Sequence, residues 1–182
     1  QGDYYYYYLN DEIMKYSTKD GDEIKDNKYA AFIDYKDDNL YGLTNYYIDL
    51  VDDRNKSKDE VDVKYRLHIL DSNTYHFLGF EYGYDVIHED QLDHMINIYN
   101  TATKDKDYIG LGFFHIPFVE YKDAIEQYKN SSDPSKIGQG EFLDESGFAY
   151  KDDNAYEKMK SANINAYFVG HNHQDYGDIL YK

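Results

Sequence analysis

The sequence predicts an α/β fold, and three observations favour it. Strand-like runs rich in aromatic and β-branched residues alternate with stretches whose apolar residues recur at helical spacing. Two runs, Ile109–Phe114 and Ala166–Val169, are apolar enough to be buried strands. A histidine follows each of them closely, and ligand sites in open α/β sheets lie at the C-terminal ends of the strands.

Three helices are expected from apolar periodicity. In Glu89–Thr101 the apolar side chains fall at positions i, i+3, i+4 and i+7, which is typical of a helix with one buried face. A second stripe follows Pro117, and a third covers Asn154–Ala162. The residues predicted to be buried on these faces are Leu92, Met95, Ile96, Tyr121, Ile125, Tyr156 and Met159.

The remaining segments divide into strands and loops. Strands are predicted at Lys28–Tyr35, Asn45–Val51, Val63–Leu70 and Gly177–Tyr181. The glycine-bearing stretches Asn73–Tyr84 and Asn130–Gly140 are predicted to be loops, and Leu9–Tyr16 a short helix after the five tyrosines Tyr4–Tyr8. No linker divides the chain, so residues 1–182 are expected to form a single domain.

The composition limits the kinds of partner. Thirty-six acidic and 19 basic residues give a formal charge of −17, which argues against binding nucleic acid or anionic membranes through a basic surface. No apolar run approaches about 20 residues, so no membrane span is expected. There is no cysteine to form a disulfide. Asn-X-Ser triplets at Asn55 and Asn130 lean toward a secretory route but leave the compartment unknown.

The C-terminal histidines predict a metal site. His171 and His173 are two residues apart and therefore point to the same side of an extended chain, while Asn172 faces away. Gly170 allows a sharp turn where a Cβ would clash. We expect both imidazoles to meet His115, which follows the other apolar run, because neutral imidazole suits transition metals.

The other histidines are assigned no role in this site. His68 is predicted to be a strand residue, His94 to be exposed on its helix, and His76 and His88 to be bystanders without a partner pattern. Each metal-binding imidazole needs an acceptor that orients it, and Asp175 and Glu141 are both candidates for that role.

The two histidine blocks, Phe113–Tyr121 and Val169–His173, resemble those of the calcineurin-like metallophosphoesterases, in particular the purple-acid-phosphatase-like branch of fungi and plants. Smaller similarities occur in the same order along the chain, at Gly42–Tyr46, Leu70–Ser72, Gly83–Asp85 and Gln91–Leu92. The resemblance implies a four-layer α/β/β/α sandwich, of which this chain would supply the C-terminal half, and a small phosphoester as substrate.

The resemblance also implies two transition metal ions (Fe, Zn or Mn) that activate a water for phosphoric ester hydrolysis. Members of the family hold these ions with five sequence blocks, and only the last two are present here. By resemblance, His115 and His171 would bind one metal and His173 the other. The missing blocks supply the bridging carboxylate and the general-acid histidine, so no catalytic residue is assigned.

The simplest account is a C-terminal fragment of a longer enzyme. Gln1-Gly2-Asp3 resembles the residues that follow the third block of the family. The expected partner is then the missing N-terminal half of the domain, and the chain alone should be nearly inactive. Two alternatives remain open: a non-catalytic secreted or surface binding module with a degenerate site, and a histidine site that works with a single metal.

Overall fold

A computed structural model describes residues 31–34, 40–42, 45–51, 62–101, 107–144 and 146–181. The tyrosine run Tyr4–Tyr8 and the predicted helix Leu9–Tyr16 lie outside these residues. The predicted strand Lys28–Tyr35 lies partly within them, as the strand Ala31–Asp34.

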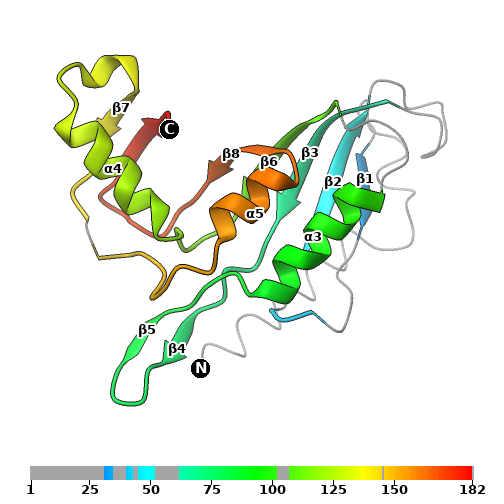
Figure 1. The fold of residues 1–182 in the computed structure, drawn as a ribbon, viewed down its shortest axis with the longest axis horizontal. Coiled ribbons are helices and arrows are strands. Elements are labelled where there is room, and N and C mark those ends of the chain that lie inside the picture. The colour runs from blue at the N-terminus through cyan, green and yellow to red at the C-terminus, as the bar shows by residue number, and fades with distance from the viewer. Residues whose placement is uncertain are drawn as a thin grey trace.

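The described residues form a five-stranded sheet in the order β1-β2-β3-β6-β8 (Figure 1). Its strands are β1 (Ala31–Asp34), β2 (Tyr46–Val51), β3 (Val63–Ile69), β6 (Ile109–Phe113) and β8 (Ile164–Phe168). β1, β2 and β3 pair antiparallel, whereas β3, β6 and β8 run parallel. Helices lie in the connections between the parallel strands, so the α/β prediction is confirmed.

The helices occur where periodicity predicted them. They are α3 (Glu89–Thr101), α4 (Glu120–Asn130) and α5 (Ala155–Ser161). α3 and α5 pack beside one another on the same face of the sheet (Figure 1). Among the described helices, none has the length and apolar character needed to cross a bilayer.

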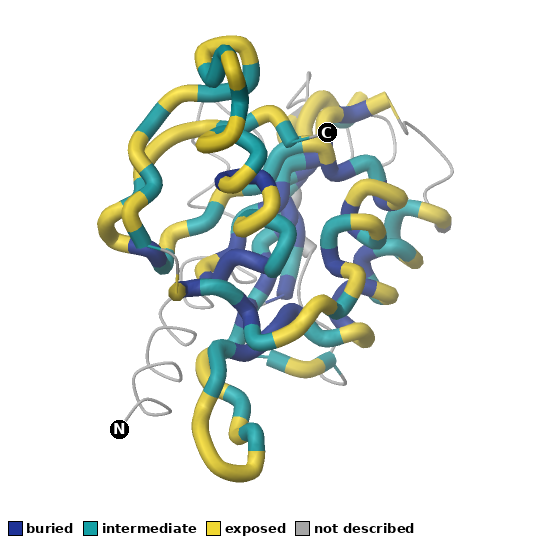
Figure 2. Tube along the Cα trace, turned by 60° about the vertical axis from the view of Figure 1, so that its left-hand side comes forward, coloured by how far each residue is buried: buried dark blue, intermediate teal, exposed yellow. Residues whose placement is uncertain are grey.

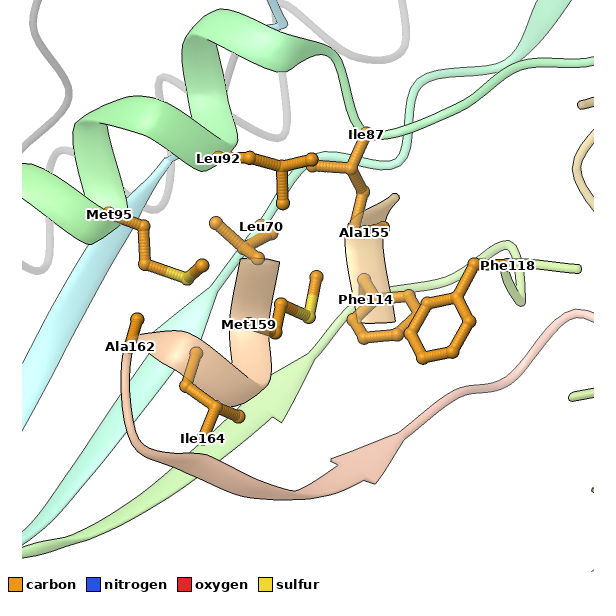
Figure 3. Packing of buried hydrophobic residues seen from close by; sticks show 10 residues of the cluster. All are labelled: Leu70, Ile87, Leu92, Met95, Phe114, Phe118, Ala155, Met159, Ala162 and Ile164. Atoms are coloured by element: carbon orange, nitrogen blue, oxygen red, sulfur yellow. The ribbon is translucent and has the colours of Figure 1, made fainter. Parts of the chain in front are cut away.

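The hydrophobic core lies between the sheet and these two helices. Leu92, Met159 and Ile164 have no exposed surface, and Met95 is 2% exposed (Figure 3). Ile125 on α4 is also buried. Three other residues that were predicted to be buried are only half-buried. They still pack against this core: Ile96, Tyr121 and Tyr156.

Two predicted loops contain short strands instead. β4 (Tyr75–Phe77) and β5 (Tyr82–Tyr84) form a hairpin, and β7 (Gly138–Glu141) pairs antiparallel with β9 (Tyr176–Ile179). These strands have three or four residues, which is too short for alternation to stand out among glycines and aromatic residues. The predicted strand Gly177–Tyr181 corresponds to β9, which pairs with β7 and lies outside the five-stranded sheet.

A polar cluster lies on the helix-covered face of the sheet. Arg66 donates two hydrogen bonds to Asp49, at 2.6 and 2.8 Å, and both side chains are buried. His68 is a strand residue, as predicted; burial and the neighbouring Arg66 lower its pKa to about 3. His94 was predicted to be exposed, but it is half-buried and lines a small cavity with His68, because α3 packs closely over β3.

Candidate functional site

The pairing of β6 with β8 brings two histidines together. The two strands are parallel neighbours, and backbone hydrogen bonds continue the pairing beyond them, from Phe114 N to Phe168 O and from Gly170 N to His115 O. His115 and His171 therefore leave the same edge of the sheet. Their nitrogens His115 Nε2 and His171 Nδ1 are 3.1 Å apart, and the two rings are nearly perpendicular.

His173 shares an open hollow of about 580 Å³ with these two residues. The hollow is lined by Tyr84, His115, Leu143, Asp144, Ser146, Gly147, His171, His173 and Gln174. Asn172 is buried and is not part of the lining, so alternation places the two imidazoles on one side and the amide on the other. The three histidines thus line one hollow, and within it His115 and His171 are in contact.

His115 is fixed by the segment that follows β3 (Val63–Ile69). The buried Ser72 hydroxyl accepts hydrogen bonds from the backbone N–H of His115 (3.2 Å) and of Ile116 (2.8 Å). Gly170 leaves the space that the ring needs, since a Cβ at that position would lie 3.1 Å from His115 Nδ1. A side chain at this position would have to displace the His115 ring by a few tenths of an ångström.

The turn that carries His171 and His173 is held by contacts with Leu143 and Asp144. Asp175 accepts hydrogen bonds from the backbone N–H of Leu143 (2.6 Å) and Asp144 (2.9 Å). Its second oxygen accepts one from Asn172 Nδ2 at 3.2 Å. Asp175 therefore positions the turn as a whole rather than orienting an imidazole, and Glu141, the other predicted acceptor, is exposed in β7.

Two residues that pack against this turn, Gly147 and Tyr84, were not predicted to do so. A Cβ on Gly147 would overlap Asn172 Oδ1 and lie 3.0 Å from His171 Cδ2, so only glycine permits this packing. The Tyr84 ring packs edge-on against His171 with centroids 4.3 Å apart. The similarity at Gly83–Asp85 pointed to the Tyr84 segment in the sequence, but no pattern marked Gly147.

The electrostatics of the site favour a neutral His171. Burial lowers the pKa of His171, and the neighbouring His115 lowers it further. A neutral imidazole keeps a lone pair available to a metal. Asp144, at the rim of the hollow, has a lowered pKa because Ser146 donates hydrogen bonds to its carboxylate and because His171 and His173 lie near it.

The donors fit part of a metal site. Two ligand nitrogens at about 2.0–2.1 Å from a tetrahedral ion lie roughly 3.3 Å apart, which is close to the 3.1 Å between His115 and His171. Within the described part of the chain, however, no three His, Asp or Glu side chains are grouped so that they could hold one ion. A complete site therefore requires ligands in addition to these.

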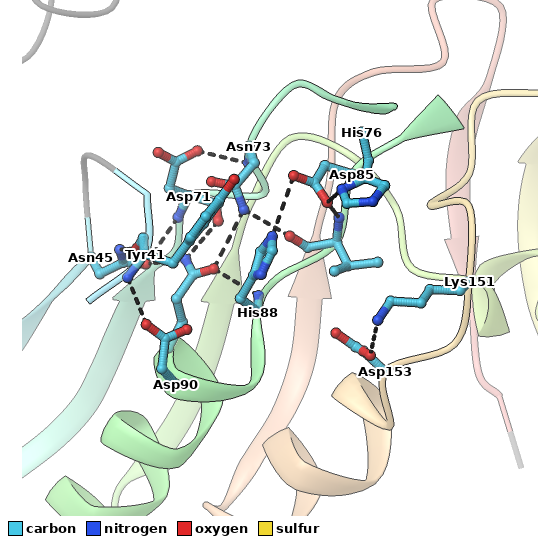
Figure 4. Close-up of polar contacts among 12 residues, drawn as sticks. Tyr41, Asn45, Asp71, Asn73, His76, Asp85, His88, Asp90, Lys151 and Asp153 are labelled. Atoms are coloured by element: carbon cyan, nitrogen blue, oxygen red, sulfur yellow. Dashed lines mark hydrogen bonds and ion pairs between the residues drawn. The ribbon is translucent and has the colours of Figure 1, made fainter. Parts of the chain in front are cut away.

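His76 and His88 belong to a different cluster, which forms before α3 (Figure 4). Both face the buried carboxylate of Asp85: His88 Nε2 lies 3.3 Å from it and His76 Nδ1 3.9 Å from it. His88 also stacks on Tyr41. These histidines are bystanders to the hollow, but they have a structural role that the sequence did not predict.

One curated protein gives a partial match. The chain is 35% identical over 85 residues to Phosphatase DCR2 of Saccharomyces cerevisiae, and the match covers 46% of this chain. It spans only 14% of the length of that protein. No family model and no solved structure matches the chain. At the level that these comparisons reach, the chain is similar to part of a phosphatase.

Proposed function

We propose that this chain is the C-terminal part of a calcineurin-like metallophosphoesterase domain of the purple-acid-phosphatase-like branch. Its activity would be the metal-dependent hydrolysis of small phosphoesters. The observation that carries the proposal is the 3.1 Å approach of His115 Nε2 to His171 Nδ1, at the ends of parallel neighbours, in a hollow shared with His173.

The similarity to Phosphatase DCR2 supports the reaction class, since it comes from the sequence alone and does not depend on the site geometry. The histidine spacing supports the family. Neither a phosphate-binding loop nor a serine or cysteine nucleophile is required for this chemistry, because two ions supply the Lewis acidity that stabilises charge on phosphoryl oxygens.

The chain's own residues have defined parts in this proposal. His115 and His171 are the donors for one ion, and His173 is a donor for the second. Ser72 holds the backbone of His115, and Asp175 holds the turn that carries the other two histidines. The remaining ligands, including a bridging carboxylate, would come from the N-terminal half of the domain.

Exposed apolar side chains on one face of the sheet support the proposed four-layer sandwich. Tyr65 and Ile109 are paired across β3 and β6 and are 42% and 47% exposed, although their side chains are large and apolar. A second sheet packed on this face would bury them. The missing half of an α/β/β/α domain would provide such a sheet.

The test compares the 182-residue chain with a longer protein translated from the upstream coding sequence. We expect the chain alone to hydrolyse p-nitrophenyl phosphate poorly or not at all, because three imidazoles shared by two ions leave each ion under-coordinated. The longer protein should bind two metals and turn over substrate. His171→Ala should abolish that turnover, whereas His94→Gln, outside the hollow, should retain it.

Two results would contradict the proposal. Tight binding of two metals and an ordinary turnover rate by the 182 residues alone would show that no further half is needed. A longer protein with no metal-ligating blocks and no turnover would instead favour a non-catalytic binding module with a degenerate site. Metal content by mass spectrometry, measured beside the rates, separates these two results.

A further inference from the structure

The β4–β5 hairpin carries aromatic rings on one face. Tyr75 lies opposite Tyr84 in the register, and Phe77 lies opposite Tyr82. Residues directly opposite one another share a face, so all four rings point to the same side. The ring centroids are 5.3 Å apart in the first pair and 5.1 Å apart in the second. We call these four residues the aromatic face.

The opposite face fixes the hairpin to the rest of the molecule. His76 stacks on Tyr150 with centroids 4.8 Å apart and planes 5° apart. Gly83 lies against the same residue, since a Cβ there would be 2.7 Å from Tyr150 Cβ. The Tyr150 N–H donates to Tyr84 O at 2.8 Å. These contacts hold the hairpin from the face opposite the aromatic face, and the aromatic face itself stays open to a ligand.

The aromatic face is open to solvent. Tyr75, Phe77 and Tyr82 are 61%, 56% and 69% exposed, and the hairpin projects from the body as a largely exposed loop (Figures 1 and 2). Glu81 is the only charged residue between Tyr75 and Tyr84 in a chain with a net charge of −17. A neutral, apolar face at such exposure is typical of a binding surface.

Tyr84 joins the aromatic face to the candidate site. It lines the hollow and packs edge-on against His171. Two residues along a strand advance about 6.6 Å, so the Phe77–Tyr82 pair lies about that far beyond the Tyr75–Tyr84 pair. Tyr84 therefore brings one end of the aromatic face to the hollow, next to His171, where a ring connected to a phosphoryl group could meet it.

We propose that the aromatic face binds a planar aromatic or heteroaromatic ring in the leaving group of the substrate. This inference rests on the proposed function of the same hollow and adds the substrate class to it. Stacking suits the four rings because a π face has no strict hydrogen-bonding requirement. Aryl phosphates and nucleoside phosphates share this chemistry, and the test distinguishes them.

The test measures binding by titration calorimetry of the chain with AMP and with ribose 5-phosphate, which differ only by the base. We expect AMP to bind about tenfold more tightly, a difference of about 1.4 kcal/mol. In Phe77→Ala/Tyr82→Ala the preference should fall below about twofold. Tyr65→Ala is the matched control, because Tyr65 is an exposed tyrosine in β3, outside the hairpin. This variant should keep the preference for AMP.

Further ligands and a second variant make the outcome decisive. Phe77→Leu/Tyr82→Leu keeps apolar side chains in the hairpin and should also lose the preference. Phenyl phosphate, compared with propyl phosphate, tests the aryl source. Adenosine tests the ring without the phosphate: hairpin-dependent binding of adenosine supports the inference even if no phosphate binds. Absent phosphate binding by the 182 residues leaves the proposed function standing, because that proposal assigns the remaining metal ligands to the N-terminal half. Equal binding of AMP and ribose 5-phosphate would overturn the inference and leave the proposed function standing.

Discussion

The two faces of the five-stranded sheet differ in what covers them. On one face, α3 and α5 bury Leu92 and Met159 completely (Figure 3). On the other, Leu50, Tyr65 and Ile109 form a row across β2, β3 and β6 and are 38%, 42% and 47% exposed. Large apolar side chains on both faces are typical of a sheet that is covered on both faces. The described residues supply the cover for only one.

The covered face also contains the polar cluster, in which a buried charge pair lies between the sheet and the helices. Arg66 is held by Asp49 and lies over the rings of Tyr47 and Tyr108, at 4.2 and 4.7 Å. Buried charges are tolerated only with such partners. The open face has no comparable cost, because its side chains still contact water. Substitutions on the two faces should therefore differ in the size of their effect on the free energy of unfolding.

The largest effect is expected from Asp49→Ala on the covered face. Loss of the carboxylate leaves the buried Arg66 guanidinium without its partner and should lower the free energy of unfolding by about 3–5 kcal/mol. Urea denaturation measures the change. The double variant Asp49→Leu/Arg66→Met removes both charges and should cost much less; an equal cost in both variants would show that the charge pairing is not the cause.

The next comparison uses the same substitution on each face. Leu92→Ala should lower the free energy of unfolding by about 2–5 kcal/mol, since the side chain is fully buried and leaves a cavity. Leu50→Ala should cost less than about 1 kcal/mol because the side chain is 38% exposed. Equal losses in the two urea titrations would mean that the open face is covered in solution.

The covered face should also make stability depend on pH. The pKa of His68 is about 3 in the folded chain and about 6.5 when unfolded, so its contribution is complete above pH 6.5 and is lost as the pH falls toward 3. Between pH 6.5 and 4.5 the loss is on the order of 2 kcal/mol. His68→Leu should flatten the curve of unfolding free energy against pH in this window, and an unchanged slope would exclude His68 as its source.

The smallest effect is expected on the open face. Ile109→Lys should change the free energy of unfolding of this chain by less than about 0.5 kcal/mol, because its side chain is already half in water. It should also reduce any self-association seen by sedimentation. In the longer protein the same lysine would be buried under the second sheet and should be strongly destabilising, so a neutral effect there would argue against the four-layer sandwich.

The sequence predicted the candidate site better than it predicted the contacts that hold the site. Apolar runs that end near histidine predicted where His115 and His171 lie, because parallel neighbours deliver their ends to one edge. The β4–β5 hairpin and the role of His88 were missed. A three-residue strand has no periodicity to read, and the partner of His88, Asp85, is identified only when both side chains are placed around α3.

The sequence by itself determined the helices α3, α4 and α5, the strands β6 and β8, and the edge at which His115 and His171 meet, because periodicity and strand ends are local properties of the chain. Only the tertiary structure decided that Gly147 must be glycine, that Asp175 holds a turn, and that Tyr84 connects an aromatic hairpin to the hollow. These facts depend on close approach between segments distant in sequence, and such approach leaves no pattern in neighbouring residues.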